Sequence, residues 1–311
     1  MKIYTNIDDF QFIKNPVLTI GTFDGVHVGH QKIIKKMQEI ASKTNGETVI
    51  FTFFPHPRMV VNPTNHGIKL IQSQKEKLEK LASLGVDHVI IFPFTKAFSE
   101  ITASAFVSDL LVEKLKIHTI IVGYDHQFGK NREGNLSYLE DKGKEFGFKV
   151  IEIKAHEIND VNVSSSKIRQ ALTEGNIEIA NHYLNSSFEI WGKVIHGNKL
   201  GRTIGFPTAN IGVDDALKIV PRRGVYAVSI KIEDGISFKG MMNIGIRPTV
   251  NQEVKETIEI NIFDFEEDIY DKSVRICLHK RIRDEQKFDG LDSLINQLKS
   301  DEKTVRAYFN L

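Results

Sequence analysis

The chain of 311 residues has one cysteine, one tryptophan and no long apolar run. The single cysteine, Cys277, excludes an intrachain disulfide and is typical of a reducing compartment. We expect neither a cleaved leader nor a membrane-spanning helix, because no stretch has the required composition and length. The formal net charge of +1 supplies no bulk field that would favour nucleic acid or a membrane surface. These absences predict a cytoplasmic globular protein.

A length of 311 residues predicts about two domains, each large enough to bury a core. Residues 1–184 alternate between strand-like and helix-like patterns, which predicts an α/β domain with a Rossmann-like, doubly wound parallel sheet. From residue 185 to 311 the pattern is one of short alternating strands, which predicts a small antiparallel β-barrel or sheet closed by a helix at Leu291–Leu298.

Apolar spacing and turn residues locate the individual elements of both halves. The predicted strands are Lys2–Tyr4, Val17–Ile20, Thr48–Phe53, His88–Phe92, Thr119–Val122, Lys149–Ile153, Gly224–Ile232, Ile236–Met241, Thr257–Phe265 and Val274–Leu278. The predicted helices are one that begins near His30, Ser73–Leu84, Thr102–Leu115 with Thr102 as its cap, Gly134–Phe146, one that follows Val163, and Ile177–Leu184.

The predicted strand Val17–Ile20 runs into the string GTFDGVHVGH, Gly21–His30. A strand, a glycine-bearing loop and a helix start form a phosphate site, because free N–H groups and the helix dipole point at it. His27 and His30 are three apart and share a helix face, where cationic or N–H-donating imidazoles can hold polyphosphate oxygens. Either histidine alone is explained as a capping or solvated residue, and the complete string favours the phosphate site.

Three loops follow predicted parallel strands: Gly21–His30, the string PHPR at Pro55–Arg58, and GYDHQFG at Gly123–Gly129. Ligands of such sheets bind at the carboxyl ends of the strands, so these loops are expected to converge on one rim. The alternative for Asp125 and His126 is a loop that only turns the chain.

A second anion site is predicted at VSSSKIR, Val163–Arg169, where serines precede a helix-like apolar stripe. Serine hydroxyls, free N–H groups and Arg169 together favour phosphate. A simple helix cap remains the alternative for the serines.

In the second half, GNKLGR at Gly197–Arg202 is a glycine-rich turn between strands, and it is weak evidence for a nucleotide on its own. The string GFPTAN follows at once, and Thr208 and Asn210 are two residues apart, so both point the same way in an extended segment. A hydroxyl and an amide oxygen suit Mg²⁺ that also binds ATP phosphates. A polar turn after a proline is the alternative.

Glu259 lies in a strand-like segment whose isoleucines Ile258, Ile260 and Ile262 share the opposite face. A carboxylate held in this way can accept a proton from a substrate hydroxyl. Glutamates are also common on the exposed faces of strands.

The strings GTFDGVHVGH, VSSSKIR and GRTIGFPTAN, in this order, resemble those of bacterial bifunctional riboflavin kinase/FMN adenylyltransferases, the FAD synthetase family. Further strings that match are TFFPHPR, NIGIRPTV at Asn243–Val250, the Glu259 strand with FDFEEDIYDK, and RIRDEQKF at Arg281–Phe288.

The resemblance implies that the second domain phosphorylates riboflavin with ATP, with Glu259 as the base and Mg²⁺ on Thr208 and Asn210. The implied ATP-binding residues are Gly197, Lys199, Gly201, Arg202, Phe206, Pro207, Thr208 and Asn210, and the implied flavin-binding residues are Asn243, Arg247, Glu259 and Arg281.

The first domain is then implied to transfer AMP from ATP to FMN, which yields FAD and pyrophosphate, with His27 and His30 as the catalytic pair. The implied ATP-binding residues there are Gly21, Thr22, Phe23, Asp24, Gly25, His27, His30, Asp125, Ser164, Ser165 and Arg169. The sequence departs from the family pattern at His126, where an aromatic residue is usual, at Asp271 in place of glycine, and at Asn261 in place of a frequent histidine.

Two other functions stay open at this point: an adenylyltransferase for another phosphorylated substrate, and a flavin-binding regulator without catalysis. A test for phosphorylation of riboflavin distinguishes the first alternative from a bifunctional enzyme, and a test for turnover of ATP distinguishes the second. The expected partners are riboflavin, FMN and ATP, without nucleic acid or membrane, and the oligomeric state is open.

Overall fold

A computed structural model describes residues 1–61, 67–123, 126–153, 163–197, 200–233, 235–248 and 254–311. The chain divides into two compact units. The first unit comprises residues 1–69 and 74–164, and the second comprises residues 70–73 and 165–311. The sequence-based domain boundary at residue 184 stays a prediction.

The first unit is built on a six-stranded sheet with the order β1-β4-β3-β2-β5-β6, and every pairing in it is parallel. Its strands are Lys2–Tyr4 (β1), Val17–Ile20 (β2), Thr48–Phe54 (β3), His88–Pro93 (β4), Thr119–Gly123 (β5) and Lys149–Ile153 (β6). The predicted α/β fold is confirmed. The strand order reverses between β2 and β5, which makes a topological switch point, the position where such sheets bind ligands.

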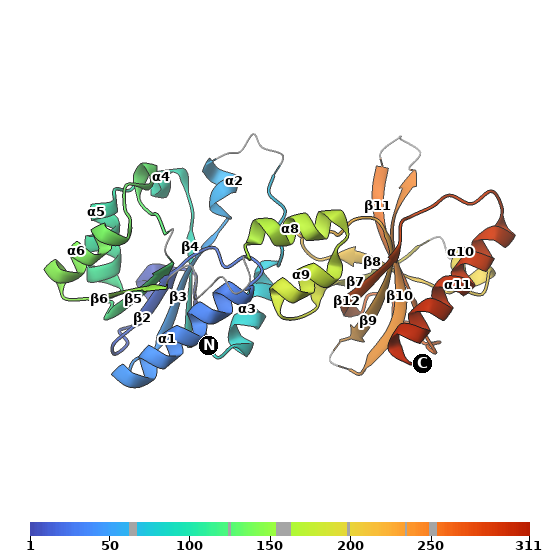
Figure 1. Cartoon of the computed structure of the whole chain (residues 1–311), viewed down its shortest axis with the longest axis horizontal. Coiled ribbons are helices and arrows are strands. Elements are labelled where there is room, and N and C mark those ends of the chain that lie inside the picture. Colours follow the sequence, from blue (N-terminus) through green and yellow to red (C-terminus); the bar gives the residue numbers. More distant parts are fainter. Residues whose placement is uncertain (62–66, 124–125, 154–162, 198–199, 234, 249–253) are drawn as a thin grey trace. The chain divides into compact units, whose positions relative to one another are not determined.

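Both faces of this sheet are covered, because successive side chains of the central strands point to opposite sides. On one face Val17, Ile50 and Val89 pack under helices α1 (Val28–Thr44) and α3 (Gln74–Ser83). On the other face Leu18, Phe51 and Ile120 pack under η2 (Phe106–Lys114) and α6 (Leu136–Phe146). Figure 1 shows these two helical layers. Shorter helices complete the unit: η1 (Ile7–Asp9), α2 (Pro57–Val61), α4 (Lys96–Ser99), α5 (Ala103–Ala105) and η3 (Lys130–Arg132).

The helix predicted at Thr102–Leu115 is present, but its winding is unexpected. Thr102 caps α5, since its hydroxyl accepts from the N–H of Ala105 at 3.1 Å. The helix then continues as η2, Phe106–Lys114, in the wider π form. Apolar spacing does not distinguish these windings, because both leave Phe106 and Leu110 buried.

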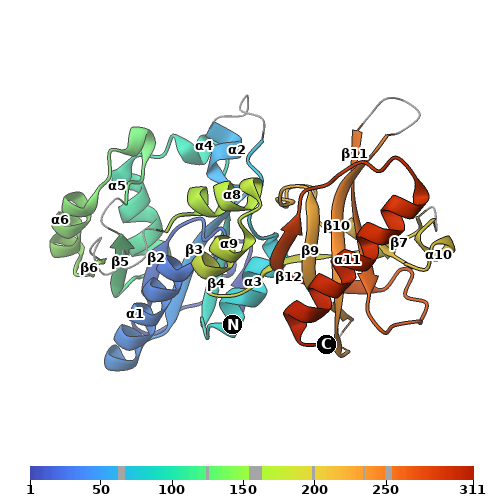
Figure 2. The ribbon, with the colours of Figure 1, turned by 45° about the vertical axis from the view of Figure 1, so that its right-hand side comes forward.

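The second unit contains a closed antiparallel barrel with the strand order β10-β11-β8-β7-β12-β9, which confirms the predicted β-barrel (Figure 2). Its strands are Phe188–Ile195 (β7), Ala209–Val213 (β8), Gly224–Ile232 (β9), Ser237–Pro248 (β10), Val254–Ile262 (β11) and Ser273–Arg283 (β12). Asp234 lies outside the described residues.

The closing helix α11, Leu291–Phe309, is longer than the predicted Leu291–Leu298. Its second half continues the apolar stripe through Val305 and Phe309, which join a cluster with Phe206 and Met241 of the barrel. Three further helices belong to this unit: α8 (Ser165–Glu174), α9 (Ile177–Leu184) and the short α10 (Leu200–Thr203). Asn181 joins α9 to the barrel, because its amide donates to the carbonyl of Leu278 at 2.8 Å.

Candidate active sites

The rim of the parallel sheet gathers the predicted loops at the carboxyl ends of their strands. A cavity of about 690 Å³ is lined there by Gly21 and Thr22 after β2, by Pro57 and Arg58 after β3, and by residues 126–129 after β5. The expected convergence of the three loops is therefore confirmed. Asp125 lies outside the described residues.

Aromatic side chains make up much of the wall of this cavity. Phe53, Phe94 and Phe98 contact one another, with ring centroids 5.4–5.9 Å apart. Phe106 and Phe128 line another part of the wall, and His126 stacks on Phe128 with centroids 5.9 Å apart. A cavity of this size with flat apolar walls and a few polar groups suits a planar aromatic ligand.

His27 and His30 stack directly on each other, with ring centroids 3.7 Å apart. His27 is the N-cap of α1, and its Nδ1 accepts from the N–H of His30 at 3.4 Å. Phe23 stacks on the other side of His30 at 4.6 Å. Within the described part of the chain, Nδ1 of His30 has no hydrogen-bond partner although it is buried. The capping and phosphate interpretations of His27 are thus compatible.

Burial favours the neutral form of both imidazoles. Burial lowers the pKa of His27 to about 4, although the nearby Asp24 opposes the shift. Burial, together with His27 and the Lys77 ammonium, lowers the pKa of His30 well below its usual range. Of the two predicted forms, cationic or N–H-donating, the geometry favours the second.

The loop that carries these residues has an unusual backbone. Phe23 and Val26 both have positive φ angles, 51° and 39°, although neither is glycine. Such angles are costly for bulky residues and persist only where the surroundings enforce them. Part of that enforcement comes from Lys77, a buried residue of α3 that the sequence analysis did not single out. Its Nζ donates to the carbonyl of Thr22 at 3.3 Å.

The residues of the predicted second anion site lie at and just before the start of α8. Ser165 and Arg169 fall in the first half of this helix, and Ile168 forms its buried side as expected. Ser164 closes the first unit and Ser165 opens the second.

In the barrel, the predicted catalytic and metal-binding residues converge on one cavity of about 360 Å³. Glu259 of β11 pairs directly with Asn210 of β8 in the antiparallel ladder. Thr208, Asn210 and Glu259 all line the cavity, and Asn243, a predicted flavin-binding residue, does so from β10. The expectation that Glu259 faces away from the isoleucines is confirmed, since Ile258 and Ile260 are buried while Glu259 is partly exposed.

Two close contacts shape the loop next to these residues. A Cβ atom on Gly201 would collide with the carbonyl oxygen of Phe206, and one on Gly197 would collide with the amide of Asn210. Asn261, one of the departures from the family pattern, donates from Nδ2 to the carbonyl of Pro207 at 2.8 Å. It therefore supports the turn that presents Thr208.

A second hollow, about 450 Å³ in volume, lies on the other side of Thr208. Arg202 and Pro207 line it together with Tyr270. Asp271, another departure, has φ of 62°, a left-handed conformation that glycine adopts without cost and that aspartate tolerates. Its N–H donates to the carbonyl of Val194 at 2.9 Å, so the turn is kept.

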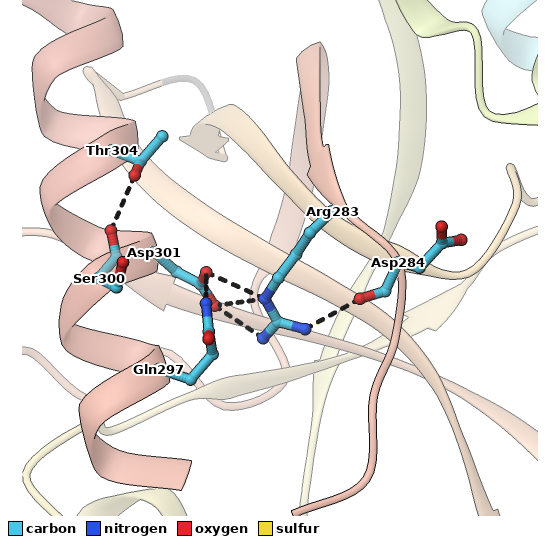
Figure 3. Close-up of polar contacts among 6 residues, drawn as sticks. All are labelled: Arg283, Asp284, Gln297, Ser300, Asp301 and Thr304. Carbon is cyan, nitrogen blue, oxygen red and sulfur yellow. Dashed lines mark hydrogen bonds and ion pairs between the residues drawn. The ribbon is translucent and has the colours of Figure 1, made fainter. Parts of the chain in front are cut away.

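A buried ion pair joins α11 to the wall of the barrel cavity (Figure 3). Arg283 of β12 holds Asp301 through Nε at 3.0 Å and through its terminal nitrogen at 2.7 Å. Gln297 adds a hydrogen bond to Asp301 at 2.9 Å. Sequence patterns do not reveal this pair, because two residues 18 positions apart give no local signal.

Arg281, predicted to bind flavin, lies elsewhere. Its guanidinium donates to the carbonyl of Arg223 and to Asp284, both at 2.6 Å, and it is not among the described residues that line the cavity. Lys199 lies outside the described residues, and for Arg247 only the backbone, in β10, is described.

These two units define a class of protein: a nucleotide-binding α/β unit with a histidine pair, followed by a barrel that carries a glutamate and an oxygen-rich turn. Comparison with family models identifies the two parts of this class. Residues 10–167 match the model described as FAD synthetase, and residues 184–309 match the model described as riboflavin kinase.

Curated relatives match nearly the whole length of the chain and carry both of these names. A bifunctional riboflavin kinase/FMN adenylyltransferase of Escherichia coli K12 is 39% identical over 95% of this chain and 93% of its own. One from Buchnera aphidicola of Schizaphis graminum is 38% identical over 100% of both. A crystal structure titled as a macrolide-efflux protein from Streptococcus pneumoniae superposes with a TM-score of 0.88, at 32% identity and 98% coverage of both chains.

The chain belongs to the family of bifunctional riboflavin kinase/FMN adenylyltransferases. Its first part is the adenylyltransferase and its second part the kinase, and its substrates are riboflavin, FMN and ATP. The two alternatives left open above are therefore set aside. Among the described residues, no helix has the length and apolarity that crossing a membrane requires.

Proposed function

We propose that Glu259 is the base of the kinase reaction and that the cavity of about 360 Å³ in the barrel holds riboflavin. The observation that carries this proposal is the direct pairing of Glu259 with Asn210 at the edge of that cavity, beside Thr208. Glu259 takes the proton of the 5′-hydroxyl while the hydroxyl oxygen bonds to the γ-phosphorus of ATP, and ADP leaves. Asn243, on the same wall, orients the flavin.

Magnesium fits the donors present on this wall. Thr208 and Asn210 offer a hydroxyl and an amide oxygen, the hard ligands that Mg²⁺ prefers. In such sites one or two protein ligands are usual, and phosphate oxygens of the substrate and water would supply the rest. The ion would neutralise phosphate charge, and Gly197, Gly201 and Arg202 would cover the nucleotide.

For the adenylyltransferase, we propose that His27 and His30 donate N–H groups to the phosphates of ATP. The FMN phosphate attacks the α-phosphorus, the bond to the β-phosphate oxygen breaks, and pyrophosphate leaves. That phosphate is largely ionised at neutral pH, so the step requires no protein base. Neutral imidazoles stabilise the charge that develops on the α-phosphate oxygens. The family resemblance supports a phosphate-binding role for Ser164, Ser165 and Arg169.

The aromatic cavity of about 690 Å³ is the proposed place of the flavin ring of FMN. Phe53, Phe98 and Phe128 offer faces for stacking, and Arg58 offers a cation for the phosphate. His126 keeps this aromatic character, because its ring is stacked on Phe128. We further propose the cytoplasm as the location, which the single cysteine favours.

The assignment of two sites is tested with one pair of variants. Glu259→Gln should lower FMN formation from riboflavin by about 100-fold or more and leave the conversion of FMN to FAD intact. His30→Ala should lower FAD formation by a similar factor and leave FMN formation intact. Chromatography of the flavin products measures both reactions.

Two exposed residues give matched controls: Glu256→Gln on the same strand and His182→Ala on α9. Both control variants should retain both reactions. If either active-site change abolished both activities in protein that still folds, the assignment of separate sites would be wrong.

A further inference from the structure

One strongly buried cation of the first unit is not used in the mechanism above. Lys77 of α3 is only 6% exposed. Its Nζ donates to the carbonyl of Thr22 at 3.3 Å and to Oγ1 of Thr52 at 3.2 Å, and the same hydroxyl also donates to Thr22 at 3.1 Å. Lys77 therefore joins α3, the end of β3 and the loop after β2.

Burial of a lysine is costly, because the ammonium loses its hydration shell. Packing alone would be served better by an apolar residue of the same length. The two hydrogen bonds recover part of the cost, and Asp24, buried in the same loop, attracts the ammonium. A retained charge at this place points to a ligand of opposite sign, and the loop beside it is the proposed site of a triphosphate.

We propose that Lys77 is a positioning residue of adenylyl transfer, which braces the loop Gly21–Val26 against β3 and supplies a fixed positive charge beneath the triphosphate of ATP. This inference rests on the proposed role of the histidine loop. The brace fixes the carbonyl of Thr22, one residue before Phe23, whose ring packs on His30. Displacement of that ring would move the imidazole that donates to the phosphates.

The charge of Lys77 makes the reaction depend on pH in a defined way. Burial lowers the pKa of Lys77 to about 8, against the attraction of Asp24. Besides Asp24, the titratable group that interacts with this charge is His30, whose pKa the Lys77 ammonium helps to lower. Glu76, the adjacent residue on the same helix, is also buried. The ammonium is present below about pH 8 and lost above it. Bound ATP stabilises the cation, so the loss shifts to higher pH in the complex.

The test measures FAD formation from FMN and ATP in the full chain, without riboflavin, so that the kinase has no flavin to phosphorylate. Lys77→Met should lower kcat/KM for ATP by about 10- to 100-fold, the range that misplacement of a reacting group produces. Lys80→Met, one turn further along α3 at a half-exposed site, is the matched control and should match the wild type.

The pH profile separates this role from simple packing. In the wild type, kcat/KM for ATP should decline as pH rises through about 8, and kcat should decline only at higher pH. Lys77→Arg keeps a charge that does not titrate in this range, so its profile should stay level there. Equal kcat/KM for Lys77→Met and Lys80→Met, or an unchanged decline in Lys77→Arg, would overturn the inference. A wild type that made no FAD from FMN would instead overturn the proposed function.

Discussion

Replacement of Asp301 by asparagine should destabilise the barrel and weaken riboflavin binding together. Asp301 is 3% exposed in its side chain and Arg283 is 19% exposed. The change keeps the shape and removes the charge, so the guanidinium stays mostly buried without a counterion. Breaking a buried pair in this way costs about 3–5 kcal/mol. We expect about 3 kcal/mol, since Arg283 has some access to water and keeps its bond to the carbonyl of Asp284.

Trp191 provides a selective assay for this loss. It is the only tryptophan and it lies in β7, so its fluorescence reports on the barrel. With a urea m-value of about 1–3 kcal/mol/M, a loss of about 3 kcal/mol lowers the unfolding midpoint by about 1–3 M. The KM for riboflavin should also rise, because Leu294 and Leu298 of the same helix line the barrel cavity proposed for riboflavin.

The chain contains a matched control. Asp264 makes a similar paired contact with Arg306 of the same helix, at 3.0 Å for both bonds, but its side chain is 74% exposed. Asp264→Asn should lower the unfolding midpoint far less than Asp301→Asn does, because water already solvates the charges of a surface pair.

A double-mutant cycle decides whether the buried pair carries the effect. Combining Arg283→Met with Asp301→Asn removes both charges, so the double variant should recover about 2 kcal/mol relative to the sum of the single changes. Additive losses, or equal losses for Asp301→Asn and Asp264→Asn, would refute the reasoning.

Two further predictions concern the loops of the two sites. His27 has a folded-state pKa of about 4, below its unfolded value of 6.5, so its contribution to stability is present above about pH 6.5 and lost as pH falls towards 4. Hydrogen exchange of the α1 amides should show a loss on the order of 3 kcal/mol from His27. His27→Gln should reduce the acid-induced loss without abolishing it, because the pKa of His30 is lowered as well. Gly201→Ala should lower kinase activity by about 10-fold or more, because the new methyl group collides with the carbonyl oxygen of Phe206. The control is Gly290→Ala, which should leave kinase activity unchanged because nothing lies within 4 Å of the new methyl group. Equal kinase activities of the two variants would contradict this prediction.

Local patterns in the sequence were enough for most of the elements and for the identity of the principal loops. Alternation placed Glu259 opposite its isoleucines, since the period of a strand depends on the backbone alone. The spacing of three also brought the rings of His27 and His30 together, although His27 is the extended N-cap of α1 and not a residue of its first turn. The parallel sheet followed from the order of elements, and that order also predicted the rim on which the loops meet.

Tertiary structure alone decided which charged residues are buried and which ones meet. Lys77 belongs to the charged stretch Lys75–Lys80, which by itself indicates a solvated helix face, yet it is buried against Thr52 and Thr22 from two other segments. Arg283 and Asp301 meet only because α11 folds back on β12, and Arg281, two residues away, points to a different part of the unit. The charge states of the histidines were decided in the same way, because desolvation depends on everything packed around a group and not on its neighbours in the chain.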